Sequence, residues 1–160
     1  MSARQPDAAR ISRLLALCRK DAAGLERVIA RLFSRPMTIE QLATLDTDDS
    51  LAERVEAFAA RFGRLQDALS DKLLPAYFDL VEESPRPVVE MLDRAERLGL
   101  VSSADAFITA RKLRNRLVHE YVEDRAELAD NLNAARVAST LLTATLARVA
   151  EAISRYTDRP

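Results

Sequence analysis

Residues 111–121, RKLRNRLVHEY, gather more potential chemistry than any other stretch of the chain. They hold four cationic side chains, one amide, the only histidine of the sequence and a tyrosine. Histidine has an ordinary pKa near neutral pH, so it can accept or donate a proton there. Arginine and lysine can hold a phosphate or another anion beside it. The stretch is therefore the candidate site for proton transfer next to a bound anion.

Helical spacing divides these side chains between two faces. At about 100° per residue, one line of the helix carries the histidine, the amide and the lysine, and another carries one arginine between two aromatic residues. Arg114 and His119 are then about 140° apart, so an ideal helix does not bring them together. Two such helices facing each other across the two-fold axis of a homodimer would do so. The first line is Lys112, Asn115 and His119, with Arg116 beside it, and the second is Phe107, Arg114 and Tyr121.

Other chemistries find little support in the sequence. Cys18 and His119, about a hundred residues apart, are the only cysteine and histidine, so a zinc site of clustered ligands is not expected. No Glu-x-x-His pair marks a carboxylate metal site. The glycines form no phosphate-binding loop, and no nucleophile turn accompanies the histidine. The sequence therefore predicts no metal and no cofactor.

The composition is typical of a mostly helical protein with one domain. Glycine is scarce, tryptophan is absent, and 160 residues suit one core of ordinary size. The formal net charge of −1 gives no overall basic field, so a polyanion would have to bind to a local patch. Cys18, in the apolar run LLALC, excludes an intramolecular disulfide and is predicted to be a small buried hydrophobe in a reducing compartment.

The sequence predicts no membrane segment. The N-terminal MSARQPDAAR is polar and lacks the apolar run of a signal peptide. The most apolar late stretch, VASTLLTATLARVA, is too short, and too interrupted by Arg148, to be expected to span a bilayer. We therefore expect a soluble, cytoplasmic protein with no membrane partner.

Apolar residues at helical spacing predict four or five helices and no strand, which together form an all-α antiparallel bundle. The first helix is expected to open at Pro6 and to run to about Phe33. A short helical turn should start near Pro36, and a long helix with an acidic start at residues 47–49 should follow it. Pro75 is expected to end or kink that long helix.

The motif lies on a later helix with its own start signal. That helix is predicted to start at Ser102, with Asp105 completing a capping-box-like pair. A shorter helix before it should close at Gly99, and the last helix should run from about Asp124 to Tyr156. Long helices joined by short connections favour antiparallel neighbours.

The stretch RNRLVHEY resembles the R-x4-H-x-Y signature of HEPN-domain proteins, especially the HepT-like ribonuclease toxins of bacteria. Arg114, His119 and Tyr121 stand at the matching positions, and Asn115 supplies the polar residue that commonly follows the arginine. The segment RFGRLQDALSDKLLPA, residues 61–76, looks like the second-helix segment of HepT-like chains. The resemblance covers roughly residues 50 to 150. It implies a single HEPN-like domain over residues 1–160, with residues 1–50 as an N-terminal helical extension.

This resemblance implies metal-independent RNA cleavage. The ribose 2′-hydroxyl would attack the adjacent phosphorus and leave a 2′,3′-cyclic phosphate and a 5′-hydroxyl. A homodimer would supply the second histidine of a composite site. His119 would move protons, Arg114 would hold the phosphate and Asn115 would orient one of them. Three further cations would attract the RNA backbone: Arg111, Lys112 and Arg116.

The resemblance also implies partners. They are RNA (not DNA) and a cognate nucleotidyltransferase-type antitoxin, which would attach AMP to Tyr121 and so silence a toxin. Two alternatives stay open. The chain could be a non-catalytic HEPN module that binds a nucleotidyltransferase partner or a nucleotide. It could also be a helical interaction protein in which the motif is accidental and the arginines form a solvated surface.

Overall fold

The computed structural model describes residues 4–81, 83, 87–119 and 123–159, and the side chains at 4–7, 118 and 119 lie outside that description. Throughout these residues every regular element is a helix, which confirms the predicted all-α bundle. The described chain has six helices when α3, η1 and α4, which are continuous, are counted as one, whereas the sequence predicted four or five. The elements are α1 (Arg4–Leu32), α2 (Ile39–Leu42), α3 (Asp49–Ala68), η1 (Leu69–Leu73), α4 (Leu74–Leu80), α5 (Val88–Arg97), α6 (Ala104–His119) and α7 (Arg125–Thr157).

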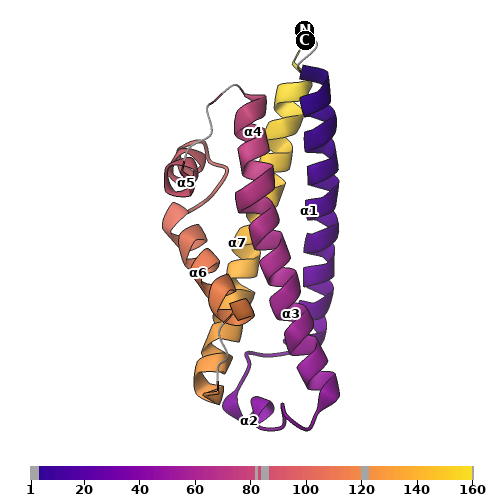
Figure 1. Ribbon diagram of the computed structural model, residues 1–160, viewed down its shortest axis with the longest axis vertical. Coiled ribbons are helices and arrows are strands. Elements are labelled where there is room, and N and C mark those ends of the chain that lie inside the picture. The colour runs from indigo at the N-terminus through magenta and orange to yellow at the C-terminus, as the bar shows by residue number, and fades with distance from the viewer. Residues whose placement is uncertain (1–3, 82, 84–86, 120–122, 160) are drawn as a thin grey trace.

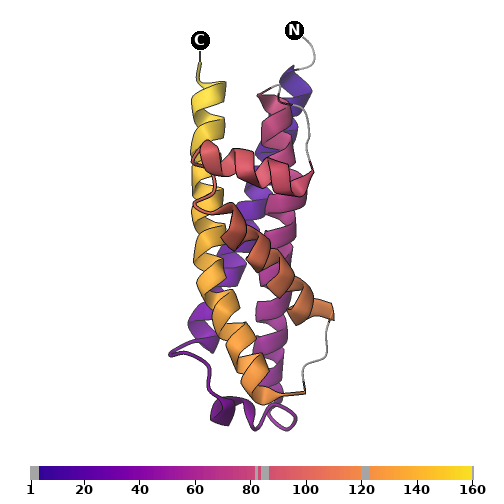
Figure 2. The same ribbon diagram turned by 90° about the vertical axis from the view of Figure 1, so that its left-hand side faces the viewer.

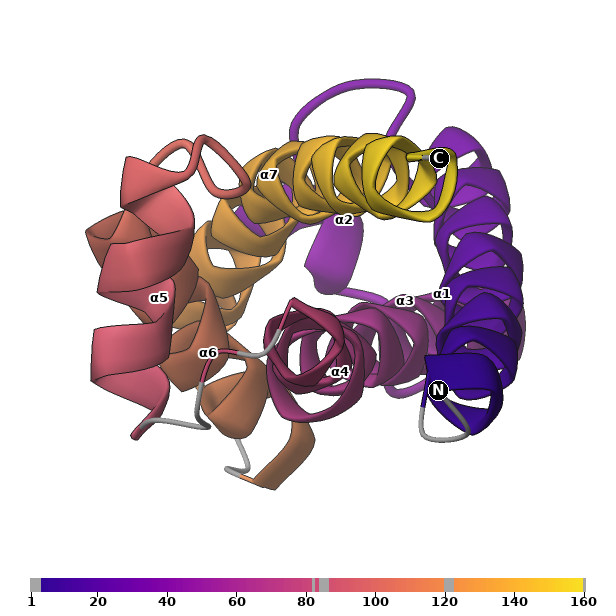
Figure 3. The same cartoon turned by 90° about the horizontal axis from the view of Figure 1, so that it is seen from above.

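The long helices alternate in direction along the bundle. In Figure 1, α1 descends from the N-terminal end, α3 to α4 ascends, α6 descends, and α7 ascends to the C-terminal end. Figure 2 shows α5 lying across the bundle and α6 inclined to it. Seen from above in Figure 3, α1 lies on one side and α5 with α6 on the other, with α3, α4 and α7 between them. The motif helix α6 therefore packs on the outside of the bundle, against α3 and α7.

Helix α1, expected as part of an extension, is a full-length helix of this bundle. Its buried side chains recur every three or four residues and join the same hydrophobic core as those of α3 and α7. Helix α1 packs along the length of α3. The buried apolar side chains of α1 are Ile11, Leu15, Cys18, Ala22, Leu25, Val28 and Leu32.

The break expected at Pro75 takes the form of a π-helical turn. Proline has no N–H, and its ring would clash with the carbonyl four residues earlier in a regular helix. The turn η1 comes immediately before Pro75, and Leu74 N–H donates to the carbonyl of Leu69, five residues back. The chain then continues as a helix to Leu80. Pro75 therefore widens one turn without ending the helix.

Three predicted helix starts are shifted in the structure, and the first of them is that of α1, which begins at Arg4 and not at Pro6. Ser103, not Ser102, caps α6, because its Oγ accepts a hydrogen bond from the Ala106 N–H at 3.1 Å. The short helix α2 begins after Thr38, not at Pro36. Its capping box satisfies the first N–H groups through the Thr38 hydroxyl and the Gln41 amide.

The predicted helix end at Gly99 and helix start at Asp124 are confirmed. Gly99 follows α5 with a φ of 75°, a left-handed conformation that suits glycine. The N–H of Leu100 donates to the carbonyl of Ala95 at 2.9 Å and closes the helix end. The Asp124 carboxylate caps α7 by accepting from the Ala126 N–H at 2.8 Å.

Helix α7 is longer than the apolar stretch considered in the sequence. Among the described residues it is the one helix long and apolar enough to cross a membrane by length and composition alone. About a third of its most apolar window, 33%, is buried in the protein, and it packs against α1, α3 and α6. Those contacts make α7 part of the bundle.

Candidate functional site

The motif helix α6 is held by a narrow apolar face. Its buried side chains recur every three residues and pack against α3, α5 and α7. The opposite face of α6 points to solvent and carries most of the polar motif residues. The buried positions are Ala104, Phe107, Ala110 and Leu113, and the exposed motif residues are Lys112, Asn115 and Arg116.

Arg114 lies at the edge between these two faces. Its side chain is 19% exposed, and its Nη2 donates to Oδ2 of Asp67 on α3 at 2.7 Å. Its Nη1 donates to Oδ1 of the neighbouring Asn115 at 3.2 Å. Bonds at Nη1 and Nη2, the two terminal guanidinium nitrogens, restrict the rotation of this long side chain, so Arg114 is held in a defined orientation.

A second, weaker ion pair joins the same helices. Arg111 Nη2 lies 3.9 Å from Oδ1 of Asp71 on the π-helical turn η1. The Ser70 hydroxyl donates to the same carboxylate oxygen at 3.1 Å and orients it. Asp67 and Asp71 are four residues apart on one helix, and Arg111 and Arg114 are three apart on the other, so each set lies on one helix face. The two ion pairs therefore lie one helical turn apart along the seam between α3–η1 and α6.

These pairs change how the motif charges are distributed. Two of the four cations face carboxylates, whereas no ion-pair partner within 4.0 Å is found for Lys112 or Arg116 in the described part of the chain. Both of these side chains are exposed. The surface of α6 that is open to a polyanion is therefore formed by Lys112, Asn115 and Arg116.

Two predicted site residues, His119 and Tyr121, fall partly or wholly outside the described residues. The side chain of His119, at the end of α6, and all of Tyr121 lie outside the described residues. The predicted separation of Arg114 from His119 thus stays a prediction. The structure does bring Arg114 and Asn115 together, although the helical projection put them on different lines.

Sequence reasoning missed the carboxylates that orient the motif arginines. Asp67 and Asp71 lie inside the quoted segment 61–76, and their spacing of four residues on a helix was a usable signal. What the sequence lacked was the packing of α3 against α6, which decides which charges meet.

The described residues contain no group of three or more His, Cys, Asp or Glu side chains placed to hold a metal ion. Cys18 is fully buried, and burial raises the pKa of its thiol to about 11, with Asp21 adding to the effect. At neutral pH the thiol is protonated, so it is a poor nucleophile and a poor metal ligand.

No family model, curated protein or solved structure matches this chain. The resemblance to HEPN proteins therefore rests on the motif residues and the segment 61–76.

Proposed function

We propose that the protein is a HEPN-like, metal-independent endoribonuclease toxin that cleaves RNA at a composite site of a homodimer. One observation carries the proposal: Arg114 is partly buried and oriented by Asp67 at 2.7 Å and Asn115 at 3.2 Å. An oriented cation stabilises developing negative charge without having to reorganise during the reaction. A solvated surface arginine has no such fixed position.

The reaction needs two proton transfers and a stabilised phosphorane. The ribose 2′-oxygen attacks phosphorus as its proton moves to a base, and the bond to the 5′-oxygen breaks as that oxygen receives a proton. His119 of each chain takes one of these roles, so the dimer provides both. Arg114 binds the non-bridging oxygens, and its contact with Asn115 fixes the direction from which it approaches. Lys112 and Arg116, both exposed, attract the backbone.

One observation favours the alternative, a non-catalytic HEPN module that binds a nucleotidyltransferase partner or a nucleotide. Arg114 and Arg111 both face carboxylates, which tie α6 to α3 and oppose the positive charge that a phosphate would need. In that case the arginines stabilise the bundle, and the exposed face of α6 binds the partner.

Substitution of the motif separates these two functions. His119→Ala and Arg114→Ala should each lower RNA cleavage about a hundredfold or more. Arg97→Ala, at an exposed position on α5, is the matched control and should leave cleavage unchanged. Circular dichroism checks that each variant stays folded. Cleavage that is lost in a chelator and restored by magnesium would contradict the mechanism, and a strictly monomeric active protein would contradict the composite site.

The proposed regulation is tested at Tyr121. Adenylation there by a nucleotidyltransferase-type antitoxin would add a phosphate anion, which competes with RNA for the motif cations. Intact-mass measurement after incubation with such an enzyme and ATP should show AMP added to the native chain and none added to Tyr121→Phe. An equal mass gain in Tyr121→Phe would exclude this residue as the acceptor.

A further inference from the structure

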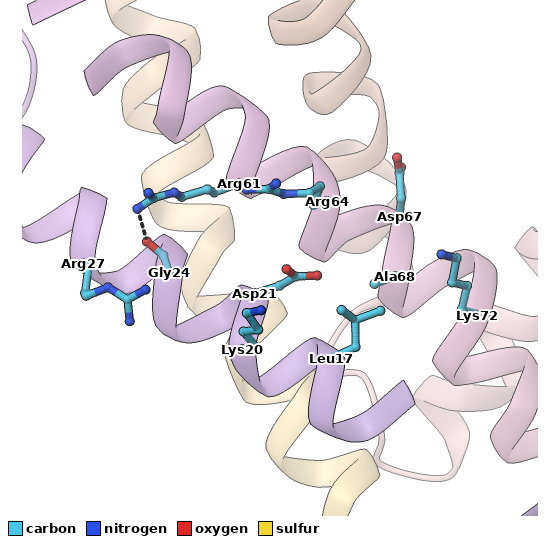
Figure 4. A pocket seen from close by; sticks show the side chains of 10 residues that line it. All are labelled: Leu17, Lys20, Asp21, Gly24, Arg27, Arg61, Arg64, Asp67, Ala68 and Lys72. Carbon is cyan, nitrogen blue, oxygen red and sulfur yellow. Dashed lines mark hydrogen bonds between the residues drawn. The ribbon is translucent and has the colours of Figure 1, made fainter. Parts of the chain in front are cut away.

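A second group of cations lines a pocket that includes no residue of the motif. The pocket, about 560 Å³, lies between α1 and the α3–η1 helix (Figure 4). Five cationic and two acidic side chains line it, a local charge of +3 on a chain whose net charge is −1. The charged residues are Lys20, Asp21 and Arg27 of α1, and Arg61, Arg64, Asp67 and Lys72 of α3 and η1.

Most of this positive charge is not neutralised by the protein itself. Arg61 donates to the carbonyl of Gly24 at 2.8 Å, which fixes the arginine without cancelling its charge. Asp67 is paired with Arg114, so its charge is already opposed from the α6 side. Within the described ranges, no carboxylate lies within 4.0 Å of the four remaining cations, which are Lys20, Arg27, Arg64 and Lys72. The pocket is therefore a local site of positive potential.

The shape and lining of the pocket indicate what kind of anion it fits. Arg61 and Lys72 are eleven residues apart, which is about 16 Å of helix and more than one phosphate group occupies. None of the ten lining residues is aromatic, so the pocket offers no platform on which a base could stack. A mononucleotide site would normally add such a platform or an apolar enclosure. An extended row of backbone phosphates matches the cations better.

One residue of the pocket, Asp67, contacts the motif. Asp67 lines the pocket and also holds Arg114 of α6. We propose that the α1–α3 pocket binds backbone phosphates of the same RNA strand that the motif cleaves. These phosphates belong to nucleotides beyond the one that Arg114 binds. The choice of RNA as the polyanion rests on the proposed ribonuclease function. The binding surface itself rests on the pocket and its unneutralised cations.

Charge removal tests this surface against a matched control. Arg27→Gln, Arg64→Gln and Lys72→Gln are combined in a His119→Ala chain, so that the RNA stays intact. The control combines three substitutions with the same change in net charge at exposed sites outside the pocket: Arg35→Gln, Arg97→Gln and Arg148→Gln. The probe is a fluorescein-labelled oligouridine of about 20 nucleotides, long enough to span the pocket. Fluorescence anisotropy gives Kd between about 50 and 200 mM salt.

Three lost phosphate contacts should reduce the slope of log K against log salt by about 2, since each contact on a single strand contributes about 0.7. Affinity at low salt should fall at least tenfold in the pocket variant and less than twofold in the control. Equal losses in the two variants, or no loss in either, would overturn the inference. Absence of RNA binding by the His119→Ala chain would overturn it as well.

Cleavage by the chain with His119 intact separates this inference from the proposed function. The pocket substitutions should raise KM for a long RNA about tenfold and leave kcat within about twofold, because the pocket binds RNA without contacting the reacting atoms. RNA that is bound through the pocket and never cut would refute the nuclease and retain the binding surface. If RNA is cleaved and the pocket substitutions leave KM unchanged, the nuclease function stands and the proposed binding surface is refuted.

Discussion

Replacing Asp67 with asparagine should weaken the fold and strengthen RNA binding at the same time. Asp67 accepts from Arg114 at 2.7 Å, and its side chain is 40% exposed while that of Arg114 is 19% exposed. Asparagine keeps a carbonyl oxygen at nearly the same place, so Arg114 retains a hydrogen-bond acceptor. The substitution therefore removes charge from the seam between α3 and α6 and leaves most of its geometry.

The lost charge on the hydrogen bond sets the expected change in stability, and the lost repulsion sets the expected change in RNA affinity. A hydrogen bond to a charged group contributes about 1.5–3 kcal/mol to stability, and a neutral acceptor recovers roughly half of it. Because Asp67 is partly exposed, the loss in the free energy of unfolding should be about 1 kcal/mol. For RNA, a carboxylate about 6 Å from a bound phosphate repels it by about 0.7–3 kcal/mol, depending on the effective dielectric. After screening by salt, its removal should tighten RNA binding about fivefold.

Urea unfolding and anisotropy measure the two effects. At this chain length, a loss of 1 kcal/mol lowers Tm by about 2–4 °C and lowers the urea midpoint without changing the slope m. The matched control is Asp46→Asn, which removes a carboxylate that pairs with Arg125 at 3.0 Å but is 81% exposed. Such a surface pair contributes less than about 0.5 kcal/mol.

Two results would refute this reasoning. Equal stability losses in Asp67→Asn and Asp46→Asn would mean that the Arg114 pair does not hold α6 to α3. Weaker RNA binding by Asp67→Asn in the His119→Ala background would mean that Asp67 assists the phosphate instead of repelling it.

Three further predictions follow from local contacts. Ser103→Ala should cost about 1 kcal/mol of stability and Ser102→Ala almost nothing, because only Ser103 caps α6; equal losses by urea unfolding would contradict this assignment. Gly24→Ala should raise Tm through a gain of about 0.5–1 kcal/mol, since an added Cβ meets its nearest side-chain atoms at 3.7–3.8 Å; a lower Tm would show that α1 needs the glycine. Burial raises the pKa of the Cys18 thiol from 9.0 to about 11, so the folded chain keeps a proton that the unfolded chain loses. Stability should therefore fall between pH 9 and 11, by on the order of 2 kcal/mol more than in Cys18→Ala, and equal falls in both chains would contradict the shift.

The helices could be predicted because their apolar spacing and end signals are local. Gly99 and Asp124 act within a few residues of their own positions, and both boundaries are where the sequence placed them. The one-residue error at Ser102 arose because two adjacent serines offer the same hydroxyl. Only the backbone direction at Ser103 decides which one can reach the N–H of Ala106.

The site was less predictable because its electrostatics come from pairs of helices. The four cations of residues 111–121 are visible in the sequence as one run, yet Arg114 and Arg111 face carboxylates of another helix. The pocket cations come from two helices, α1 and the continuous α3–η1 helix, and on each helix they are separated by several residues. Their meeting depends on α1 packing along α3, which no local pattern specifies.

Asp67 joins these two regions and so limits how an RNA strand could use both. On one side it opposes Arg114, and on the other it lines a pocket of +3 charge. A phosphate at Arg114 must compete with this carboxylate, whereas in the described residues no carboxylate lies within 4.0 Å of the charged nitrogens of Arg64 or Lys72. A strand should therefore bind first to the pocket, where cations outnumber carboxylates by three. The local concentration of phosphate that results would then offset the competition from Asp67 at Arg114.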